Sequence, residues 1–471
     1  MSLPQAARNT VIQLIGRVFS TLFGIVALAA VTRYLGQEGF GWYTTVFTFL
    51  QFFGILSDFG LTLITAQMLA EPGADEEKLL ANLFSFRLIL SGIFFGAACV
   101  SVWFFPYPAI IKWGVLVLSL SFYATTLQNI FVGFYQKHLR MEKVAWGDAI
   151  GRFIILVGYI LVVWQKWSLL PILAMSVLAN VTQFFWLWYA AKRLIHLRWE
   201  VTWLVYKEIF KRSWPVAISI AFNLIYLKAD ILVLSLARTQ QEVGLYGAAY
   251  RIIDVLTTVP AMFMGIMLPL LTFAWSAGDK ETFKHYFRRA YDMMFLLALP
   301  AVFGGVYLAK PLMIFLAGAE FADSGVFLQV LLLASAAIFL AAVSAHAVIA
   351  VGKQRAIIWW YVLDATLSLA GYIILIPRYG ALAAAWVTVF SEVFIAVATF
   401  ITVFKVIGAW PQRSIFLKSL LASVLMVIII SLLPALHIIF ICLIAVIIYF
   451  VVLYLTKGIT KEMVLEMVKK S

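Results

Sequence analysis

The sequence predicts an all-α polytopic membrane protein with about fourteen transmembrane helices. Hydrophobic residues make up 64% of the 471-residue chain and charged residues only 12%, whereas soluble domains carry about 25% charged residues. The apolar residues fall in runs of about 20 or more, the length that a helix needs to cross a bilayer. Basic residues alternate between dense and sparse loops, as the two sides of a membrane require.

The predicted spans follow one another through short links. The first six cover 10–31, 41–69, 84–105, 108–135, 147–165 and 169–191. The next six cover 214–236, 248–275, 291–309, 324–350, 357–376 and 381–404, and a final pair covers 415–435 and 437–456. The links are too short for a soluble catalytic domain, and the chain lacks the phosphate-loop, zinc-protease and serine-hydrolase motifs. We therefore expect no enzyme activity.

The orientation follows from lysine and arginine in the loops. With the N-terminus inside, most of the 35 basic residues fall in or next to the cytoplasmic segments, and few fall in the opposite loops. Both termini are therefore predicted to be cytoplasmic. We attribute the net charge of +13 to this topology and to attraction by anionic lipid, and not to nucleic-acid binding.

A weak repeat, offset by 203 residues, relates the first predicted helix pair to the seventh and eighth. It aligns Gln37, Gly41 and Tyr43 with Gln240, Gly244 and Tyr246. An offset of an even number of helices keeps both copies in one orientation, which predicts two six-helix lobes around a central site. The predicted division is an N-lobe at 1–191, a cytoplasmic linker at 192–213, a C-lobe at 214–404, and helices 13 and 14 with a tail at 405–471.

Polar side chains in the first span point to a substrate site. Gln13, Arg17, Thr21 and Gly24 share one face of the predicted helix. A charge inside the membrane is costly, so Arg17 must face a partner or a wet cavity. Its forked guanidinium suits a phosphate group. We expect Arg17 to contact the substrate, with a structural pair to Asp58 as the alternative.

Further charges lie in the same predicted lobe. Asp58 lies near mid-depth and is expected to pair with Arg17 or Arg87. Asp148 and Arg152 are four residues apart, so we expect them to pair along their helix. Asp58 and Arg87 join Arg17 as candidate substrate-site residues. Together, Arg17, Arg87 and Arg152 would make the cytoplasmic half of this lobe basic.

Two more cations complete the candidate substrate-binding set. Lys228 lies two residues from Asp230, so it faces another helix or the outer surface. Arg251 precedes Asp254 by three residues, and a pair between these two is the alternative to substrate binding.

Carboxylates in predicted helices 7, 11 and 12 indicate a cation or proton site. Asp230, Asp364 and Glu392 lie inside spans, and Thr388 lies one turn before Glu392. Such oxygen ligands suit a hard cation or a proton. We expect Asp230 and Asp364 to hold sodium, or a proton to titrate there; neutralisation by Lys228 or Arg251 is the alternative. No other cofactor is expected.

Several motifs together resemble the polysaccharide-transporter flippases of the MOP superfamily. They are YLGQEGFGWY at 34–43, LSDFGL at 56–61, KAD at 228–230, VGLYGAAYR at 243–251 and IPRYGA at 376–381. The resemblance covers residues 8 to about 400 and is to the Wzx-like branch, which moves undecaprenyl-diphosphate-linked oligosaccharides. It implies two six-helix lobes in a V shape. It also implies a basic cavity for the pyrophosphate, which suits Arg17, Lys228 and Arg251, and a cation site on Asp230 and Asp364.

The predicted function is therefore translocation of such a lipid-linked oligosaccharide across the cytoplasmic (inner) membrane, driven by an ion gradient or the membrane potential. A MATE-like, cation-coupled multidrug antiporter is the main alternative; the acidic residues favour it and the basic first lobe opposes it. A membrane-embedded glycosyltransferase or polymerase would need a longer polar loop. We expect the lipid-linked glycan and membrane lipids as partners, a monomer, and an association with polysaccharide polymerase machinery.

Overall fold

The computed structural model describes residues 3–70, 75–138, 140–192, 199–434 and 436–458. For the helical residues 3–22, 25, 63, 66, 70, 215, 216 and 218–227 it describes the backbone alone. Every regular element in these ranges is helical, and ten of their helical segments are long and apolar enough to cross a membrane. The predicted all-α membrane class is therefore confirmed.

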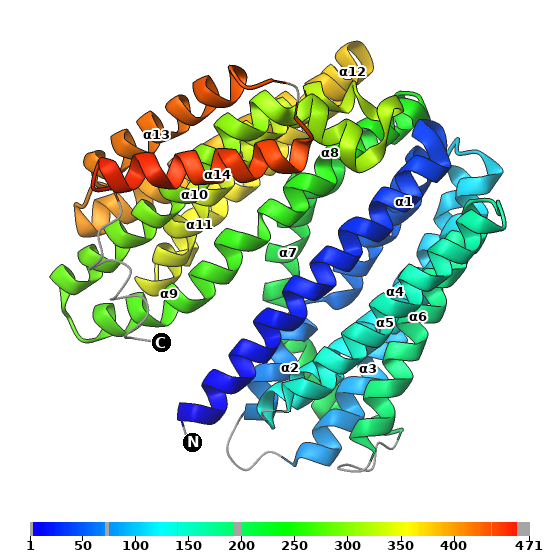
Figure 1. Ribbon diagram of the computed structural model, residues 1–471. Coiled ribbons are helices and arrows are strands. Elements are labelled where there is room, and N and C mark those ends of the chain that lie inside the picture. Colours follow the sequence, from blue (N-terminus) through cyan, green and yellow to red (C-terminus); the bar gives the residue numbers. More distant parts are fainter. Residues whose placement is uncertain (1–2, 71–74, 139, 193–198, 435, 459–471) are drawn as a thin grey trace. The chain divides into compact units, whose positions relative to one another are not determined.

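Fourteen α-helices follow one another along the chain (Figure 1). They are α1 (Leu3–Asp58), α2 (Leu61–Ala70), α3 (Glu76–Ser101), α4 (Ala109–Lys137), α5 (Met141–Trp164), α6 (Leu169–Ala191) and α7 (Trp203–Ala237). The second half holds α8 (Gln240–Leu256), α9 (Thr258–Ser276), α10 (Lys280–Ala317), α11 (Ser324–Ala350), α12 (Gln354–Ile407), α13 (Arg413–Ser431) and α14 (Ile438–Leu455). Two short 3-10 turns, Val102–Phe104 and Ala319–Phe321, follow α3 and α10.

The helices group into two compact units, Met1–Gly244 and Leu245–Ser471. In the first unit α4 packs against α6, and α1 packs along α4 and α5. The helix α7 belongs to this unit because it packs against α1, α2 and α3. In the second unit α11 packs between α10 and α12, and α13 and α14 pack on α10. The predicted division into six-helix lobes rests on the repeat and stays a prediction.

The helix α12 contains two predicted spans, and α1 contains the first predicted span and most of the second, which continues in α2 after a break at Phe59 and Gly60. In α1 the chain turns at Gly36 (φ 65°, ψ −174°), and in α12 it turns at Gly380 (φ 64°, ψ −147°). These backbone angles lie in a region that is open to glycine and strained for other residues. A single glycine therefore replaces the longer link expected between residues 31 and 41.

The predicted span 248–275 is instead two helices, α8 and α9, which meet at Thr257. Pro260 has no N–H group to donate to the carbonyl of Leu256, four residues earlier. The first helix accordingly ends at Leu256.

The predicted repeat coincides with a reciprocal contact inside the first unit. A Cβ atom added to Gly41 in α1 would lie 1.8 Å from the carbonyl oxygen of Gln240 at the start of α8. One added to Gly244 would lie 2.0 Å from the carbonyl oxygen of Gln37. The residues that the repeat aligns thus touch one another in a two-fold manner, as at a symmetric interface. Thr45 Oγ1 also donates to Gln240 Oε1 over 2.8 Å.

A proline in α10 is linked to the packing of α13 and α14. Pro300 cannot donate to the carbonyl of Leu296, and the Tyr449 hydroxyl of α14 donates to that oxygen over 2.8 Å. The Tyr449 hydroxyl also lies 2.6 Å from Ser419 Oγ of α13, which donates to the carbonyl of Phe295 over 3.0 Å. The last two helices are therefore joined to α10 where its hydrogen bonding is interrupted.

We expect Tyr449→Phe to destabilise the protein by about 1–3 kcal/mol, because the carbonyl of Leu296 loses the hydroxyl donor that stands in for the missing N–H of Pro300. Thermal unfolding of the purified protein in detergent measures this loss. Tyr454→Phe is the matched control, since Tyr454 lies in the same helix and is 65% exposed. Equal stability of the two variants would show that the Tyr449 hydrogen bonds contribute nothing.

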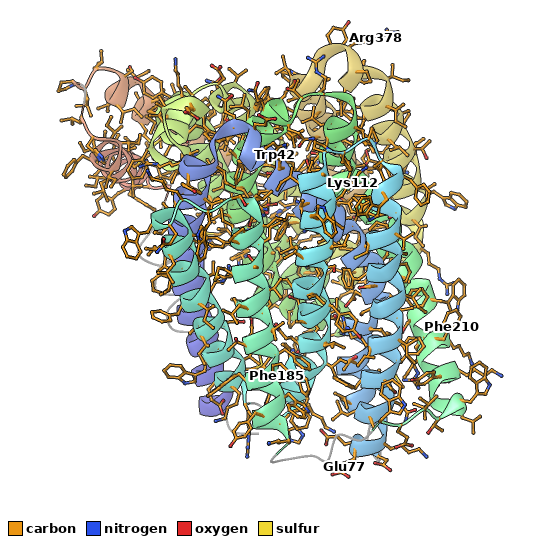
Figure 2. The ribbon with its side chains drawn as sticks, turned by 90° about the vertical axis from the view of Figure 1, so that its right-hand side faces the viewer. Trp42, Glu77, Lys112, Phe185, Phe210 and Arg378 are labelled. Atoms are coloured by element: carbon orange, nitrogen blue, oxygen red, sulfur yellow. The ribbon has the colours of Figure 1, made fainter. Side chains whose placement is uncertain are left out.

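Large apolar side chains cover the outside of the helices. In the first unit Trp164 is 75% exposed and Phe153 is 64% exposed, and Figure 2 shows Phe185 on the surface of the same unit. Water would oppose such exposure, whereas lipid does not. In the same view Trp42 and Lys112 lie at one end of this unit and Glu77 lies at the other. Residues predicted for opposite sides of the membrane thus lie at opposite ends of the unit, and which end is cytoplasmic stays a prediction.

Candidate functional site

A buried ion pair joins α3 to the end of α1. The Arg87 side chain is fully buried, and its Nη2 donates to Asp58 Oδ1 and, over 3.0 Å, to Thr62 Oγ1. Of the two partners that the sequence allowed for Asp58, the structure therefore shows Arg87. The Arg87 Nε and Nη1 atoms have no hydrogen-bond partner in the described part of the chain.

The linker before α7 is held by the same helix α3. The Thr202 amide donates to Asn82 Oδ1 over 2.7 Å, and the Tyr206 hydroxyl donates to Ser85 Oγ over 2.9 Å. Ser85 Oγ in turn donates to the carbonyl of Glu200 over 2.5 Å. Hydrogen bonds thus hold residues 200–206 of the predicted linker against α3, close to the ion pair between Arg87 and Asp58.

Arg152 lies in α5 beside α1. It is exposed, and its Nη1 atom lies 3.7 Å from the position that a Cβ atom on Gly24 would take. The expected pair between Asp148 and Arg152 is not formed: Arg152 makes no hydrogen bond or ion pair with any residue whose side chain is described. Asp148 instead accepts a hydrogen bond from Gln183 Nε2 of α6. Helical spacing alone did not reveal that a neighbouring helix offers Asp148 another donor.

The other predicted cations have different surroundings. The side chain of Arg17 lies outside the described residues. Lys228 is half-buried. Arg251 Nη1 lies 3.7 Å from Asp254 Oδ2, so the intrahelical pair that the sequence suggested is present.

The second unit contains a buried polar cluster on α12. Asp364 is fully buried; its Oδ2 accepts a hydrogen bond from Ser391 Oγ over 2.7 Å, and its Oδ1 lies 3.4 Å from Ser368 Oγ. Glu392 is 6% exposed and interacts electrostatically with Asp364. Thr388 lies on the same buried face of α12. Its hydroxyl oxygen is 3.2 Å from the hydroxyl oxygen of Tyr372. The structure thus places Asp364 beside Glu392, with Thr388 one turn before Glu392 on the same buried face of α12.

Asp230, the fourth residue, is fully buried in α7 of the first unit. The structure also reveals a carboxylate that the sequence analysis missed. Asp292 of α10 is 1% exposed, and neither carboxylate oxygen has a hydrogen-bond partner among the described residues. It escaped notice because it lies at the very start of a predicted span, close to Arg288 and Arg289. Within the described ranges, no three His, Cys, Asp or Glu side chains are grouped as a metal site.

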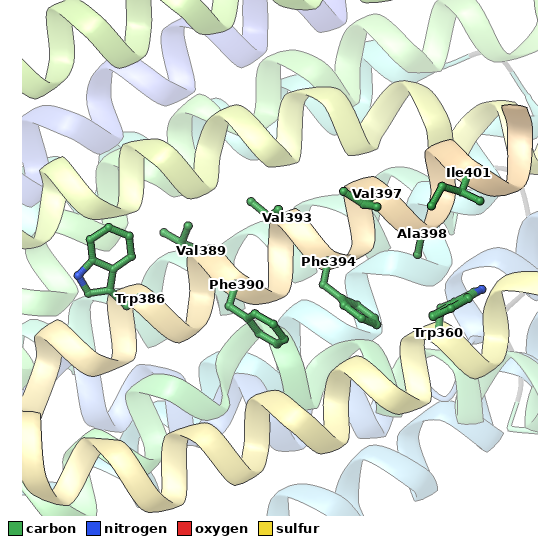
Figure 3. A pocket seen from close by; sticks show the side chains of 9 residues that line it. All are labelled: Trp360, Trp386, Val389, Phe390, Val393, Phe394, Val397, Ala398 and Ile401. Carbon is green, nitrogen blue, oxygen red and sulfur yellow. The ribbon is translucent and has the colours of Figure 1, made fainter. Parts of the chain in front are cut away.

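The second half of α12 borders an apolar groove of about 550 Å³ on the face opposite the buried Glu392 (Figure 3). Its walls are Trp360, Trp386, Val389, Phe390, Val393, Phe394, Val397, Ala398 and Ile401. Their side chains offer hydrocarbon and aromatic surface, so the groove suits a hydrocarbon chain and not a charged head group. One helix therefore carries a buried acidic face and an apolar, exposed face.

Comparison with known proteins gives the family. The model of a family described as "polysaccharide biosynthesis protein" matches residues 6–275, more than half of the chain. The chain belongs to this family. No curated protein sequence matches this polysaccharide biosynthesis protein. The resemblance of the sequence motifs to polysaccharide transporters is confirmed, and the Wzx-like branch stays a prediction.

Solved structures share the fold at low sequence identity. The lipid II flippase MurJ in an inward closed conformation has a TM-score of 0.77 and 15% identity, covering 94% of this polysaccharide biosynthesis protein and 98% of MurJ. An inward-facing multidrug-resistance MATE transporter of the MOP superfamily has a TM-score of 0.69 and 16% identity, with 83% and 94% coverage. A MOP superfamily transporter from Pyrococcus furiosus has a TM-score of 0.56 and 14% identity, with 86% and 95% coverage. The chain therefore has the fold of the MOP superfamily.

Proposed function

We propose that this protein is a flippase that moves a polyprenyl-diphosphate-linked oligosaccharide from the cytoplasmic to the outer leaflet by alternating access. The observation that supports this most is the polysaccharide biosynthesis family match on a MOP membrane fold. A diphosphate and several sugars cannot cross hydrocarbon unaided. A wet, basic cleft would take the head group while the polyprenyl tail stays in lipid.

The finer assignments belong to the same proposal. The cargo would be an undecaprenyl-diphosphate-linked glycan of the kind moved by Wzx-like transporters, and the protein would lie in the inner membrane with both termini cytoplasmic. The membrane potential favours moving a negative head group outward in a cell that is negative inside. Membrane lipids surround the protein, which would act as a monomer beside the polymerase machinery.

For the head group, Arg17, Lys228 and Arg251 remain the candidate contacts, with Asp58 and Arg87 as candidates next to them. Arginine offers paired donors to phosphate oxygens, and lysine offers a compact positive charge. The buried ion pair between Asp58 and Arg87 would lie next to the head group and support the site. In this arrangement it would hold α3 against the end of α1.

For coupling, Asp230, Asp364, Thr388 and Glu392 would hold a sodium ion or exchange a proton. The carboxylate and hydroxyl oxygens around Asp364 are the hard ligands that such a cation takes. A bound cation would offset the cost of keeping Asp364 and Glu392 charged and buried side by side.

Translocation of a fluorescent polyprenyl-diphosphate oligosaccharide in proteoliposomes tests the proposal. We expect wild type to move it and a sodium or proton gradient to accelerate it. Asp364→Asn keeps the shape of the side chain but removes its charge, so we expect the gradient-driven rate to fall at least about 10-fold. Asp323→Asn is the control, since Asp323 is exposed in the same unit.

A MATE-like cation-coupled multidrug antiporter is the second candidate. The buried Asp364 and Glu392 pair favours it, because an acidic site suits a cationic substrate. If no lipid-linked glycan moves, but a cationic dye exchanges against sodium or protons and Asp364→Asn abolishes that exchange, the antiporter replaces the flippase. If neither cargo moves, both proposals fail.

A further inference from the structure

Arg152 lies deep in the membrane by two separate measures. It is 11 residues after Met141, where α5 begins, which is about 16 Å along the helix. Its guanidinium lies next to Gly24, which is 12 residues before the turn at Gly36, or about 18 Å from it. Since the hydrocarbon core is about 30 Å thick, both measures place the charge near the middle.

The side of α5 that carries Arg152 is not the side that faces lipid. Trp146, Phe153, Ile160 and Trp164 are each more than half exposed, and their spacing by seven, seven and four residues puts them on one stripe. Arg152 lies off this stripe and reaches toward α1 instead, above the space that Gly24 leaves empty.

Arg152 meets α1 at Gly24, a position of the polar stripe predicted from the sequence. Gly24 belongs to the same helical stripe as Gln13, Arg17 and Thr21. Because a Cβ atom on Gly24 would lie 3.7 Å from Arg152 Nη1, the position of Gly24 is on the side of α1 that is turned toward α5. Arg17 precedes Gly24 by seven residues, or about two helical turns, so its position in the sequence belongs to the same stripe.

An arginine without a protein partner at this depth needs a ligand that offsets its charge. A charged side chain in the hydrocarbon region costs several kcal/mol unless it faces a partner or a wet cavity. Arg152 has no protein partner among the described side chains, while Asp148, the acid one turn earlier, accepts from Gln183. The ligand that satisfies a permanently charged, forked donor is an oxyanion, and a phosphate group fits it best.

We propose that Arg152 binds the diphosphate of the lipid-linked cargo between α5 and α1. This rests on the proposed flippase function and adds a residue to its substrate site. Arg152 would repel the cationic substrate of an antiporter, so the assignment also favours a negatively charged cargo.

Binding of farnesyl diphosphate and of farnesol to the purified full-length protein in nanodiscs tests this inference. We expect wild type to prefer the diphosphate and Arg152→Gln to bind it about 10- to 100-fold more weakly, since a hydrogen-bonded charge is lost. Arg152→Lys keeps the charge but not the fork, so its affinity should lie between the two. Arg140→Gln is the matched control, because Arg140 is exposed just before the same helix. Farnesol binding should be equal in all variants.

A second variant serves if Arg152→Gln does not fold. Gly24→Leu retains the charge but fills the space beside the guanidinium, and it should weaken diphosphate binding and leave farnesol binding unchanged. Equal diphosphate affinity of wild type and of whichever variant folds would overturn the role of Arg152 while leaving the flippase proposal intact. A wild type that binds farnesyl diphosphate no better than farnesol would count against both.

Discussion

Replacing Gly41 with alanine is expected to separate α1 from the start of α8. The new Cβ atom would lie 1.8 Å from the carbonyl oxygen of Gln240, far inside van der Waals contact. A backbone carbonyl cannot rotate away as a flexible side chain can, so the helices themselves must move. We expect a loss of stability on the order of 3 kcal/mol, and of the hydrogen bond between Thr45 and Gln240.

Thermal unfolding of the purified variant measures this effect, with Gly96→Ala as the control. Gly96 lies in α3, and a Cβ atom there would meet nothing within 4 Å, so that change should be neutral or slightly stabilising. Gly244→Ala should behave like Gly41→Ala, because its Cβ atom would lie 2.0 Å from the carbonyl oxygen of Gln37. If Gly41→Ala were as stable as Gly96→Ala, the reciprocal contact would not exist.

The second large effect is expected from Arg87→Met. Removing the guanidinium leaves Asp58 as a charge without its partner at the end of α1. Breaking a buried ion pair from one side typically costs about 3–5 kcal/mol, and the pair here is fully buried on the arginine side. We expect Arg87→Met to unfold at markedly lower temperature or to fail to accumulate in the membrane.

A double variant separates this cause from a loss of packing. Asp58→Asn combined with Arg87→Met leaves no unpaired charge, so it should recover most of the lost stability. Arg140→Met removes an exposed arginine and should change stability by less than about 0.5 kcal/mol. A double variant as unstable as Arg87→Met alone would point to lost packing around Arg87 and against the ion pair as the source.

In the proposed cation site, helical spacing predicts neighbours within one helix but not those that another helix supplies. Asp364 and Ser368 are four residues apart, a spacing that puts them on one face of a helix, and Ser368 Oγ lies 3.4 Å from Asp364 Oδ1. The hydrogen bond from Ser391 to Asp364 was not predicted, because it joins the two halves of α12 across the turn at Gly380. Spacing along one helix carries no information about which residues the next helix presents.

The sequence by itself determined the all-α membrane class, most of the helical spans, the repeat and the family. Each of these depends on local composition or on the order of motifs, because a lipid environment imposes long apolar runs and a charge bias between loops. The tertiary structure alone decided that Asp58 pairs with Arg87, that Asp148 accepts from Gln183, and that Arg152 is left facing Gly24 without a described partner. Partners of this kind depend on how each helix is rotated against its neighbours, and that rotation is set by packing between residues far apart in the chain.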